Sequence, residues 1–163
     1  MFDPKDGGLA GVGFLMTDAA PPEIHRIRLQ GPWEWAVPTS VSTQTWTWNR
    51  IRLPNEWGQL PFIPEVVWFR RRFNAPTGIT PTDRIRVAIT TLQQPTTVML
   101  NGQRQSEINS GSPGEKSVVR WDITPALAER NLLEIVFASG IRPSDIDGGM
   151  GRPVVLEIES VPN

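Results

Sequence analysis

Cysteine and tyrosine are absent from the 163 residues of this sequence, and histidine occurs once, as His25. Without cysteine the chain has no disulfide, no thiol nucleophile and no thiolate metal ligand. A single histidine excludes metal sites built from several imidazoles and, with no partner in view, argues against a catalytic triad. The sequence also has no apolar run of about 18 residues or more, so a membrane-spanning helix is not expected.

An excess of charge of one sign is also missing, because the formal net charge is -1 and 20% of the residues are charged. Such a balance supplies no field that would hold nucleic acid or an anionic membrane, so neither is expected as a partner. The short apolar segment 9–16 follows an acidic leader, which is the wrong charge for a signal peptide. A cytoplasmic location is therefore expected, with secretion through this segment as the open alternative.

The length fits one domain of ordinary size and excludes an enzymatic barrel, which needs about 250 residues. We expect residues 1–23 to form an N-terminal arm and residues 24–163 to form a single β-sandwich domain.

From residue 24 onward, apolar and polar residues alternate with period two, and turn residues interrupt the pattern about every 8 to 14 residues. The sequence contains 14 glycines and 16 prolines, which favours many turns and few long helices. This pattern predicts an all-β fold, a two-sheet antiparallel β-sandwich with eight or nine strands and one short helix near 125–130. The expected strands are 24–30, 33–35, 45–53, 66–74, 84–91, 96–100, 118–123, 132–138 and 154–159, with a short return strand over 103–105.

Turn and capping residues follow several of these strands. Asn101 and Gly102 predict a tight hairpin, because both tolerate the positive φ of a type I′ turn. Asp122 and Thr124 can cap the backbone amides that open the short helix, and Asn131 suits a left-handed residue that ends it. We therefore assign structural roles to these five residues.

Arg71 lies on the apolar face of its predicted strand, since the alternation places it with Val67, Phe69 and Phe73. A buried arginine needs a carboxylate partner. We expect that partner to be Asp122 and the role of Arg71 to be structural rather than ligand binding.

Four segments, in order, resemble the N-terminal sugar-binding domain of family 2 glycoside hydrolases, a jelly-roll sandwich of the galactose-binding-like type. They are the double-arginine strand VWFRRRF at 67–73, VMLNG at 98–102, WDITPALAERNLLEIVF at 121–137 and GGMGRPVVL at 148–156. The resemblance implies a carbohydrate-binding or accessory module, and the catalytic barrel of that family has no counterpart in these residues. Phe69 stands where the family often has tyrosine.

Carboxylates in the sequence suggest two further sites, neither of which is the favoured interpretation. Asn55 and Glu56 match the dipeptide that carries the family's catalytic acid, but they lie within the segment that resembles the binding domain. Asp145 and Asp147 alternate before glycine and resemble part of a calcium loop, which lacks the later bidentate glutamate. We therefore expect no catalytic residue and no cofactor, with a structural calcium as the open alternative.

Seven tryptophans are the most informative residues for binding, because sugars stack their C–H faces on indole rings. Trp46 and Trp48 share strand parity with Arg50 and could form a ligand platform with it. The same residues could instead form a cation–π ladder over the sheet or an interface with another chain. Three further tryptophans near loops are candidates for the same site: Trp33, Trp35 and Trp57. Trp68 and Trp121 lie within strands and are expected to be structural.

The preferred hypothesis is a non-catalytic domain that binds carbohydrate or serves as an accessory module. The alternative is a structural or protein-interaction sandwich without a ligand site, which forms a homo-oligomer or docks on another chain such as a glycoside hydrolase. A third hypothesis is an enzyme that uses a carboxylate pair on the sandwich.

Overall fold

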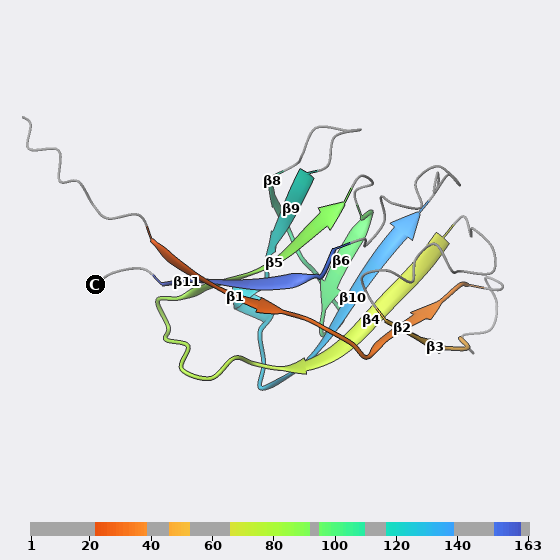
Figure 1. Ribbon diagram of the computed structural model, residues 1–163, viewed down its shortest axis with the longest axis horizontal. Helices are drawn as coiled ribbons and strands as arrows, with labels where there is room; N and C mark the ends of the chain where they lie inside the picture. The colour runs from red at the N-terminus through yellow and green to blue at the C-terminus, as the bar shows by residue number, and fades with distance from the viewer. Residues whose placement is uncertain are drawn as a thin grey trace, which may run out of the picture.

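The computed structural model describes residues 22–38, 46–52, 66–91, 95–109, 117–138 and 152–160. Within these ranges the chain forms two antiparallel sheets and one 3₁₀ turn (Figure 1). The five-stranded sheet has the order β1 (Glu23–Arg28), β11 (Val155–Ser160), β5 (Arg84–Thr91), β9 (Ser117–Asp122) and β8 (Glu107–Asn109). The six-stranded sheet has the order β3 (Asn49–Ile51), β2 (Trp33–Ala36), β4 (Val66–Asn74), β10 (Arg130–Ala138), β6 (Thr97–Leu100) and β7 (Gln103–Arg104). The predicted all-β, two-sheet antiparallel sandwich is confirmed.

The strand bounds follow the alternation of apolar residues closely. Strands β4 and β5 have the predicted bounds, whereas β8 was not among the predicted strands. The predicted helix is also shorter and earlier than expected, a single 3₁₀ turn η2 (Thr124–Ala126). Strand β10 begins at Arg130 and leaves no room for a longer helix.

The hydrophobic core lies between the sheets, because each strand directs alternate side chains inward. On β5 these side chains are Ile85, Val87 and Ile89, all buried. On the facing sheet, the rings of Phe69 and Phe137 meet edge to face with their centroids 6.2 Å apart. The period-two pattern of the sequence therefore encodes the core directly.

Trp33 anchors the connection between the two sheets, where the chain leaves β1 and enters β2. Its indole is completely buried, and its Nε1 donates a hydrogen bond to the carbonyl oxygen of Leu29 at 2.9 Å. The backbone nitrogen of Leu29 in turn donates to the carbonyl oxygen of Val154 at 2.8 Å. The indole thus packs in the core while its one polar atom is satisfied.

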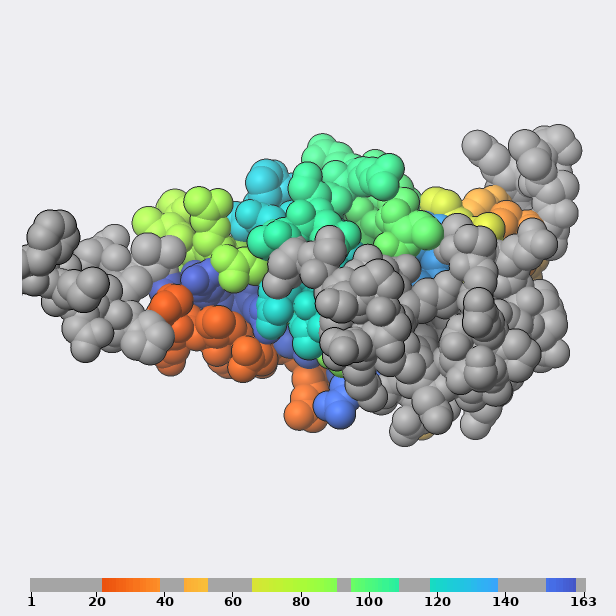
Figure 2. Space-filling model, turned by 90° about the horizontal axis from the view of Figure 1, so that it is seen from above, coloured from red at the N-terminus to blue at the C-terminus, as the bar shows by residue number. Residues whose placement is uncertain are grey.

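The first and last described strands lie side by side, since Glu23 pairs with Ser160 and the pairing runs along β1 and β11. In the space-filling view, β1 (orange) borders β11 (blue) at one end of the molecule (Figure 2). No helix in the described part of the chain is long and apolar enough to cross a membrane.

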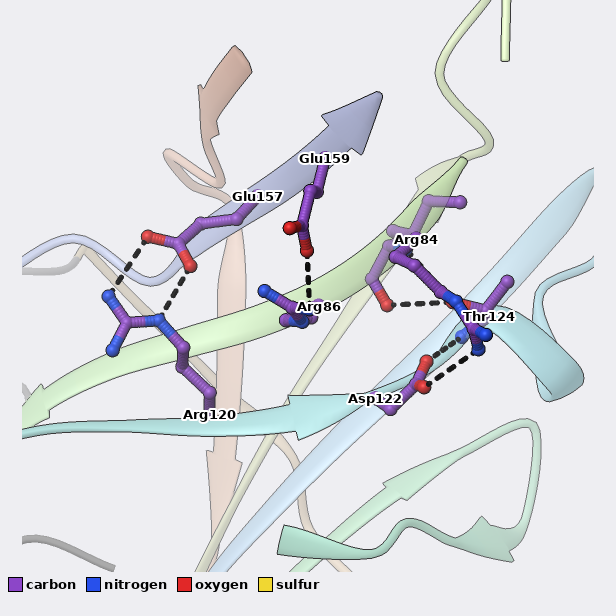
Figure 3. Close-up of polar contacts among 8 residues, drawn as sticks. Arg84, Arg86, Arg120, Asp122, Thr124, Glu157 and Glu159 are labelled. Carbon is purple, nitrogen blue, oxygen red and sulfur yellow. Dashed lines mark hydrogen bonds and ion pairs between the residues drawn. The ribbon is translucent and has the colours of Figure 1, made fainter. Parts of the chain in front are cut away.

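Arginine–carboxylate pairs cover the outer face of the five-stranded sheet (Figure 3). The carboxylate of Glu157 is only 4% exposed and accepts hydrogen bonds from Arg120 Nε at 2.7 Å and Arg26 Nε at 3.1 Å. These hydrogen bonds, from Arg120 above all, lower the pKa of Glu157 although burial acts in the opposite direction. On the neighbouring strands Arg86 pairs with Glu159.

Candidate ligand-binding site

An aromatic cluster lies on the outer face of the six-stranded sheet and brings together two of the predicted tryptophans. Trp46 and Trp48 stack with their centroids 5.8 Å apart, and Trp68 meets Trp46 edge to face at 4.8 Å. The guanidinium carbon of Arg70 lies 3.7 Å from the ring centre of Trp48, and Arg70 Nε donates to Glu34 Oε2 at 2.7 Å. We call these five residues the tryptophan cluster.

The cation in this cluster is Arg70, whereas the sequence interpretation had placed Arg50 beside the indoles. Arg50 lies opposite Glu34 in the β2–β3 register and is exposed. Sequence reasoning missed Arg70 and Trp68 as members of the cluster. Their signal was available, because the parity that places Phe69 inside must place both neighbours of Phe69 outside.

Groups of the chain itself occupy the ring surfaces of the tryptophan cluster. A guanidinium 3.7 Å above the centre of Trp48 leaves no space for a sugar on that side of the ring. Trp46 uses its own ring surface to stack on Trp48 and to meet Trp68. The arrangement matches the cation–π ladder that the sequence allowed as an alternative, rather than an open stacking platform.

The remaining tryptophan candidates have different environments. Trp33 was expected near a ligand, but its indole is fully buried in the core, so that prediction was wrong. Trp35 is half-buried and packs against the core cluster. Trp121 is 3% exposed, which confirms its structural role. Trp57 lies outside the described residues.

Arg71 lies on the inner face as the parity predicted, but the expected partner is wrong. Asp122 belongs to the other sheet, where its Oδ2 lies 3.8 Å from Arg84 and its Oδ1 accepts a hydrogen bond from the backbone of Thr124 at 2.9 Å. Within the described part of the chain, Nε and Nη1 of Arg71 are buried without a hydrogen-bond partner. The guanidinium lies 6.0 Å from the ring centre of Trp33, and its burial lowers the pKa of Arg71.

The residues predicted to shape the hairpin have the expected structural role. Asn101 and Gly102 adopt φ values of 54° and 79° and connect β6 to β7. The side chain of Asn101 donates to the carbonyl oxygen of Ala126 and to Asn131 Oδ1, both at 3.0 Å, and accepts from the backbone nitrogen of Leu132 at 2.9 Å. The hairpin is thereby tied to the start of β10.

Two of the capping predictions need correction. Asp122 does accept a hydrogen bond from the first amide of η2, but Thr124 does not cap the helix. The Thr124 hydroxyl oxygen instead accepts from the backbone nitrogen of Ile85 at 2.9 Å and ties η2 to β5. Asn131 does not adopt a left-handed conformation, because it lies within strand β10. Its side chain closes the preceding turn through two hydrogen bonds to the backbone of Ala128, at 2.9 and 2.7 Å.

A hollow of about 530 Å³ opens where strands β4 and β10 meet the β6–β7 hairpin. In the register of these strands Leu132 lies opposite Arg72 and Asn74 lies opposite Arg130, so the two exposed arginines are diagonal neighbours. Neither arginine makes a hydrogen bond or ion pair with any residue in the described ranges. We call this the Arg72–Arg130 hollow; it is lined by Arg72, Phe73, Asn74, Asn101, Arg130, Asn131 and Leu132.

A second hollow, of about 400 Å³, lies where the chain passes from β7 to β8, and we call it the crossover hollow. Two of its polar side chains are already engaged: Arg104 Nη2 donates to the carbonyl oxygen of Thr96 at 3.4 Å, and Gln105 Nε2 donates to that of Gln103 at 2.6 Å. Trp121 contributes to the lining but is almost fully buried, so its ring is not free to stack on a ligand.

The described residues contain no group of three or more histidine, aspartate or glutamate side chains that could hold a metal ion. The calcium candidates Asp145 and Asp147, and the dipeptide Asn55–Glu56, lie outside the described residues. Glu134, on the outer face of β10, is half-buried, and its burial raises the pKa of the carboxyl group against the opposing effect of Arg70.

Comparison with solved structures relates this fold to glycoside hydrolases. The FMN-binding β-glucuronidase of Faecalibacterium prausnitzii L2-6 is 21% identical with a TM-score of 0.63, over 85% of this chain and 23% of that chain. A β-glucuronidase from an uncultured Clostridium is 14% identical with a TM-score of 0.60, over 98% of this chain and 30% of that chain. A β-glucuronidase of Bacteroides uniformis is 18% identical with a TM-score of 0.59, over 83% of this chain and 18% of that chain.

This chain therefore spans less than a third of each of these enzymes. No protein-family model matches the sequence, and a search of curated proteins found no match. The resemblance carried by the four sequence segments is confirmed at the level of the fold, a β-sandwich similar to part of these glycoside hydrolases.

Proposed function

We propose that this chain is a non-catalytic accessory domain that binds a saccharide in the Arg72–Arg130 hollow. The observation that carries this proposal is the shared fold, which extends over 83–98% of this chain but accounts for only 18–31% of the glycoside hydrolases it matches. The described residues form two antiparallel sheets without a barrel among them. These findings support an accessory role beside a separate catalytic domain.

Three features favour the Arg72–Arg130 hollow over the other two surfaces. Its polar side chains include two guanidiniums that make no hydrogen bond or ion pair within the described ranges, whereas Arg104 and Gln105 of the crossover hollow donate to backbone carbonyls. Its lining also includes the half-buried side chain of Leu132, which offers apolar contact to the C–H groups of a sugar. The ring surfaces of the tryptophan cluster, in contrast, are occupied by the cluster itself.

Calorimetric titration of the full chain with a panel of neutral and acidic mono- and disaccharides tests this function. A variant that fills the hollow, Asn74→Trp, is expected to abolish the binding of any saccharide that the wild type binds. The matched control Ser106→Trp places the same bulk in the crossover hollow and is expected to leave binding unchanged. Failure of the wild type to bind any saccharide would contradict the function, and loss of binding in the control alone would contradict the site.

A second candidate function is self-association through the tryptophan cluster. It is favoured by the three half-buried indoles, which lie on an outer face of the sheet rather than in the core. Light scattering distinguishes the two functions, because a dimer that dissociates in the Trp46→Lys variant would assign the cluster to an interface. A wild-type chain that is monomeric at high concentration would exclude this function.

A further inference from the structure

We propose that the Arg72–Arg130 hollow selects saccharides that carry a carboxylate, as a uronic acid residue does. The proposal rests on the saccharide-binding function above and adds the chemical class of the ligand. Arg72 and Arg130 bind the carboxylate of the sugar, while Asn74 and Leu132 contact the rest of it.

The charge pattern of the two sheets shows what is unusual about this hollow. Elsewhere in the described chain, five arginines that point outward from the strands each pair with a carboxylate on another strand of the same sheet; they are Arg26, Arg70, Arg84, Arg86 and Arg120. At the hollow this pattern stops, since Leu132 lies opposite Arg72 and Asn74 lies opposite Arg130. The two guanidiniums are left as like charges on adjacent strands.

Diagonal neighbours on an antiparallel pair lie about 7–8 Å apart, a separation at which two long side chains can converge on one anion. Two cations at this distance repel each other until an anion is bound between them. A guanidinium presents two parallel N–H groups that match the two oxygens of a carboxylate, so this pair favours a planar carboxylate. Glu134, the nearest carboxyl group along the outer face of β10, lies beside Arg70 instead.

The base of the hollow is held in place by hydrogen bonds that do not involve these two arginines. The side chain of Asn101 fixes the backbone of Leu132, and the side chain of Asn131 fixes the turn that precedes Arg130. Both amides are thereby used within the protein. A ligand consequently meets a base that is already ordered, which reduces the conformational cost of binding.

The size and lining of the hollow favour a sugar over a small anion. Its volume of about 530 Å³ lies within the range of about 300–1,000 Å³ that is usual for small-molecule sites. An inorganic anion would use the guanidiniums alone, whereas a uronic acid also covers Leu132 and can hydrogen-bond the amide of Asn74.

The test is calorimetric titration of the full chain at low salt with methyl β-D-glucuronide and methyl β-D-glucoside, which share the pyranose ring and differ at the carboxylate. The glucuronide is expected to bind at least about tenfold more tightly, because it adds charged hydrogen bonds. Arg72→Gln and Arg130→Gln are each expected to remove most of this preference. The control Arg28→Gln changes an exposed arginine of the other sheet and is expected to leave it unchanged.

Folding of each variant is checked by thermal denaturation, and Arg72→Lys keeps the charge but lacks the paired N–H groups. The lysine variant is expected to bind the glucuronide more weakly than the wild type and more tightly than the glutamine variant. Equal binding of the two sugars by the wild type would overturn the carboxylate preference while leaving the saccharide-binding function intact. Absence of binding by either sugar, with neutral oligosaccharides also inactive, would overturn both.

Two further probes test the class of ligand, inorganic phosphate and a glutamate-rich peptide. Each is expected to bind more weakly than the glucuronide, because neither has a sugar ring that would pack against Leu132. If either bound more tightly and lost its affinity in the same arginine variants, the hollow would be a general anion site or a peptide site, and the proposal would be wrong.

Discussion

The outer faces of the two sheets both carry glutamates beside arginines, but the pKa of the glutamate is shifted in opposite directions on the two faces. On the five-stranded sheet, the carboxylate of Glu157 lies between two arginines and its pKa is lowered. On the six-stranded sheet, Glu134 lies near Arg70 but its pKa is raised, because burial outweighs the attraction of the guanidinium. Arg70 is engaged with Glu34 and with the ring of Trp48. Proximity of opposite charges therefore does not decide the outcome; direct hydrogen bonds to the carboxylate do.

This difference underlies the proposal that one face stabilises the fold while the other binds a ligand. Most charged groups in the centre of the five-stranded sheet are paired within the molecule, as Figure 3 shows for Glu157, Glu159 and their arginines. The six-stranded sheet carries indoles on its outer face. It also carries Arg72 and Arg130, which make no hydrogen bond or ion pair within the described ranges. The second face is therefore the one on which we propose contact with a ligand or another chain.

The largest expected effect comes from removing an ion pair on the outer face of the five-stranded sheet, which we call the paired face. Glu157→Gln removes the carboxylate that two arginines share and is expected to lower the free energy of unfolding by about 2–3 kcal/mol, since hydrogen bonds between charged groups are lost at a buried position. Chemical denaturation at neutral pH measures it. The control Glu129→Gln changes an exposed glutamate and is expected to have little effect. Equal stability of the two variants would show that the pairing contributes nothing to the fold.

The tryptophan cluster is expected to contribute less to stability. Trp48→Ala removes a half-buried ring and its cation–π contact with Arg70 and is expected to cost about 1–2 kcal/mol. Trp48→Phe keeps an aromatic ring beneath the guanidinium and is expected to retain about half of that stability. The same denaturation measurement checks both variants. An unchanged free energy of unfolding in Trp48→Ala would show that the cluster does not stabilise the fold, and it would favour the tryptophan cluster as a contact surface for another molecule.

The sequence predicts those features of the two faces that depend on a single strand, and it does not predict those that depend on which strands lie side by side. Strand β4 and its inward and outward faces follow from alternation alone, and so does the position of Arg71 among apolar residues. The partner of Arg71 does not follow, because it requires knowing which strands lie across from one another; Asp122 proved to be in the other sheet. Register is a long-range property that a single strand's pattern does not contain.

The candidate site shows the same limit. The alternation of residues 66–74 and 132–138 places Arg72 and Leu132 outside, but only the register of β4 against β10 makes Arg72 and Arg130 diagonal neighbours. Trp33 was misassigned for a related reason, since proximity to a turn suggested exposure. The chain in fact turns inward there, and the indole packs between the sheets.

The pH dependence of stability is a finer test of the paired face. The pKa of Glu157 is lowered in the folded state, so its contribution is fully present above the unfolded value of about 4.3 and is lost as the pH falls through the folded pKa. The difference in unfolding free energy between wild type and Glu157→Gln is therefore expected to be constant from about pH 5 to about pH 7. Below that window the difference is expected to shrink. A difference that grows on acidification would reverse the assigned direction.

Substitution of Glu134 is expected to have the smallest effect on stability. It also gives the sharpest contrast with Glu157, because the two pKa values are shifted in opposite directions. Its pKa is raised by burial, so folding favours the protonated form, and stability associated with that form is present below the unfolded pKa and lost as the pH rises through the folded pKa. Glu134→Gln is therefore expected to leave the protein unchanged in acid and to stabilise it near neutral pH, by less than about 1 kcal/mol because the group is partly solvated. Denaturation of wild type and variant across this pH range measures the difference. Destabilisation near neutral pH would mean that Arg70 attracts the carboxylate more strongly than burial penalises it, and the two faces would then differ in degree rather than in kind.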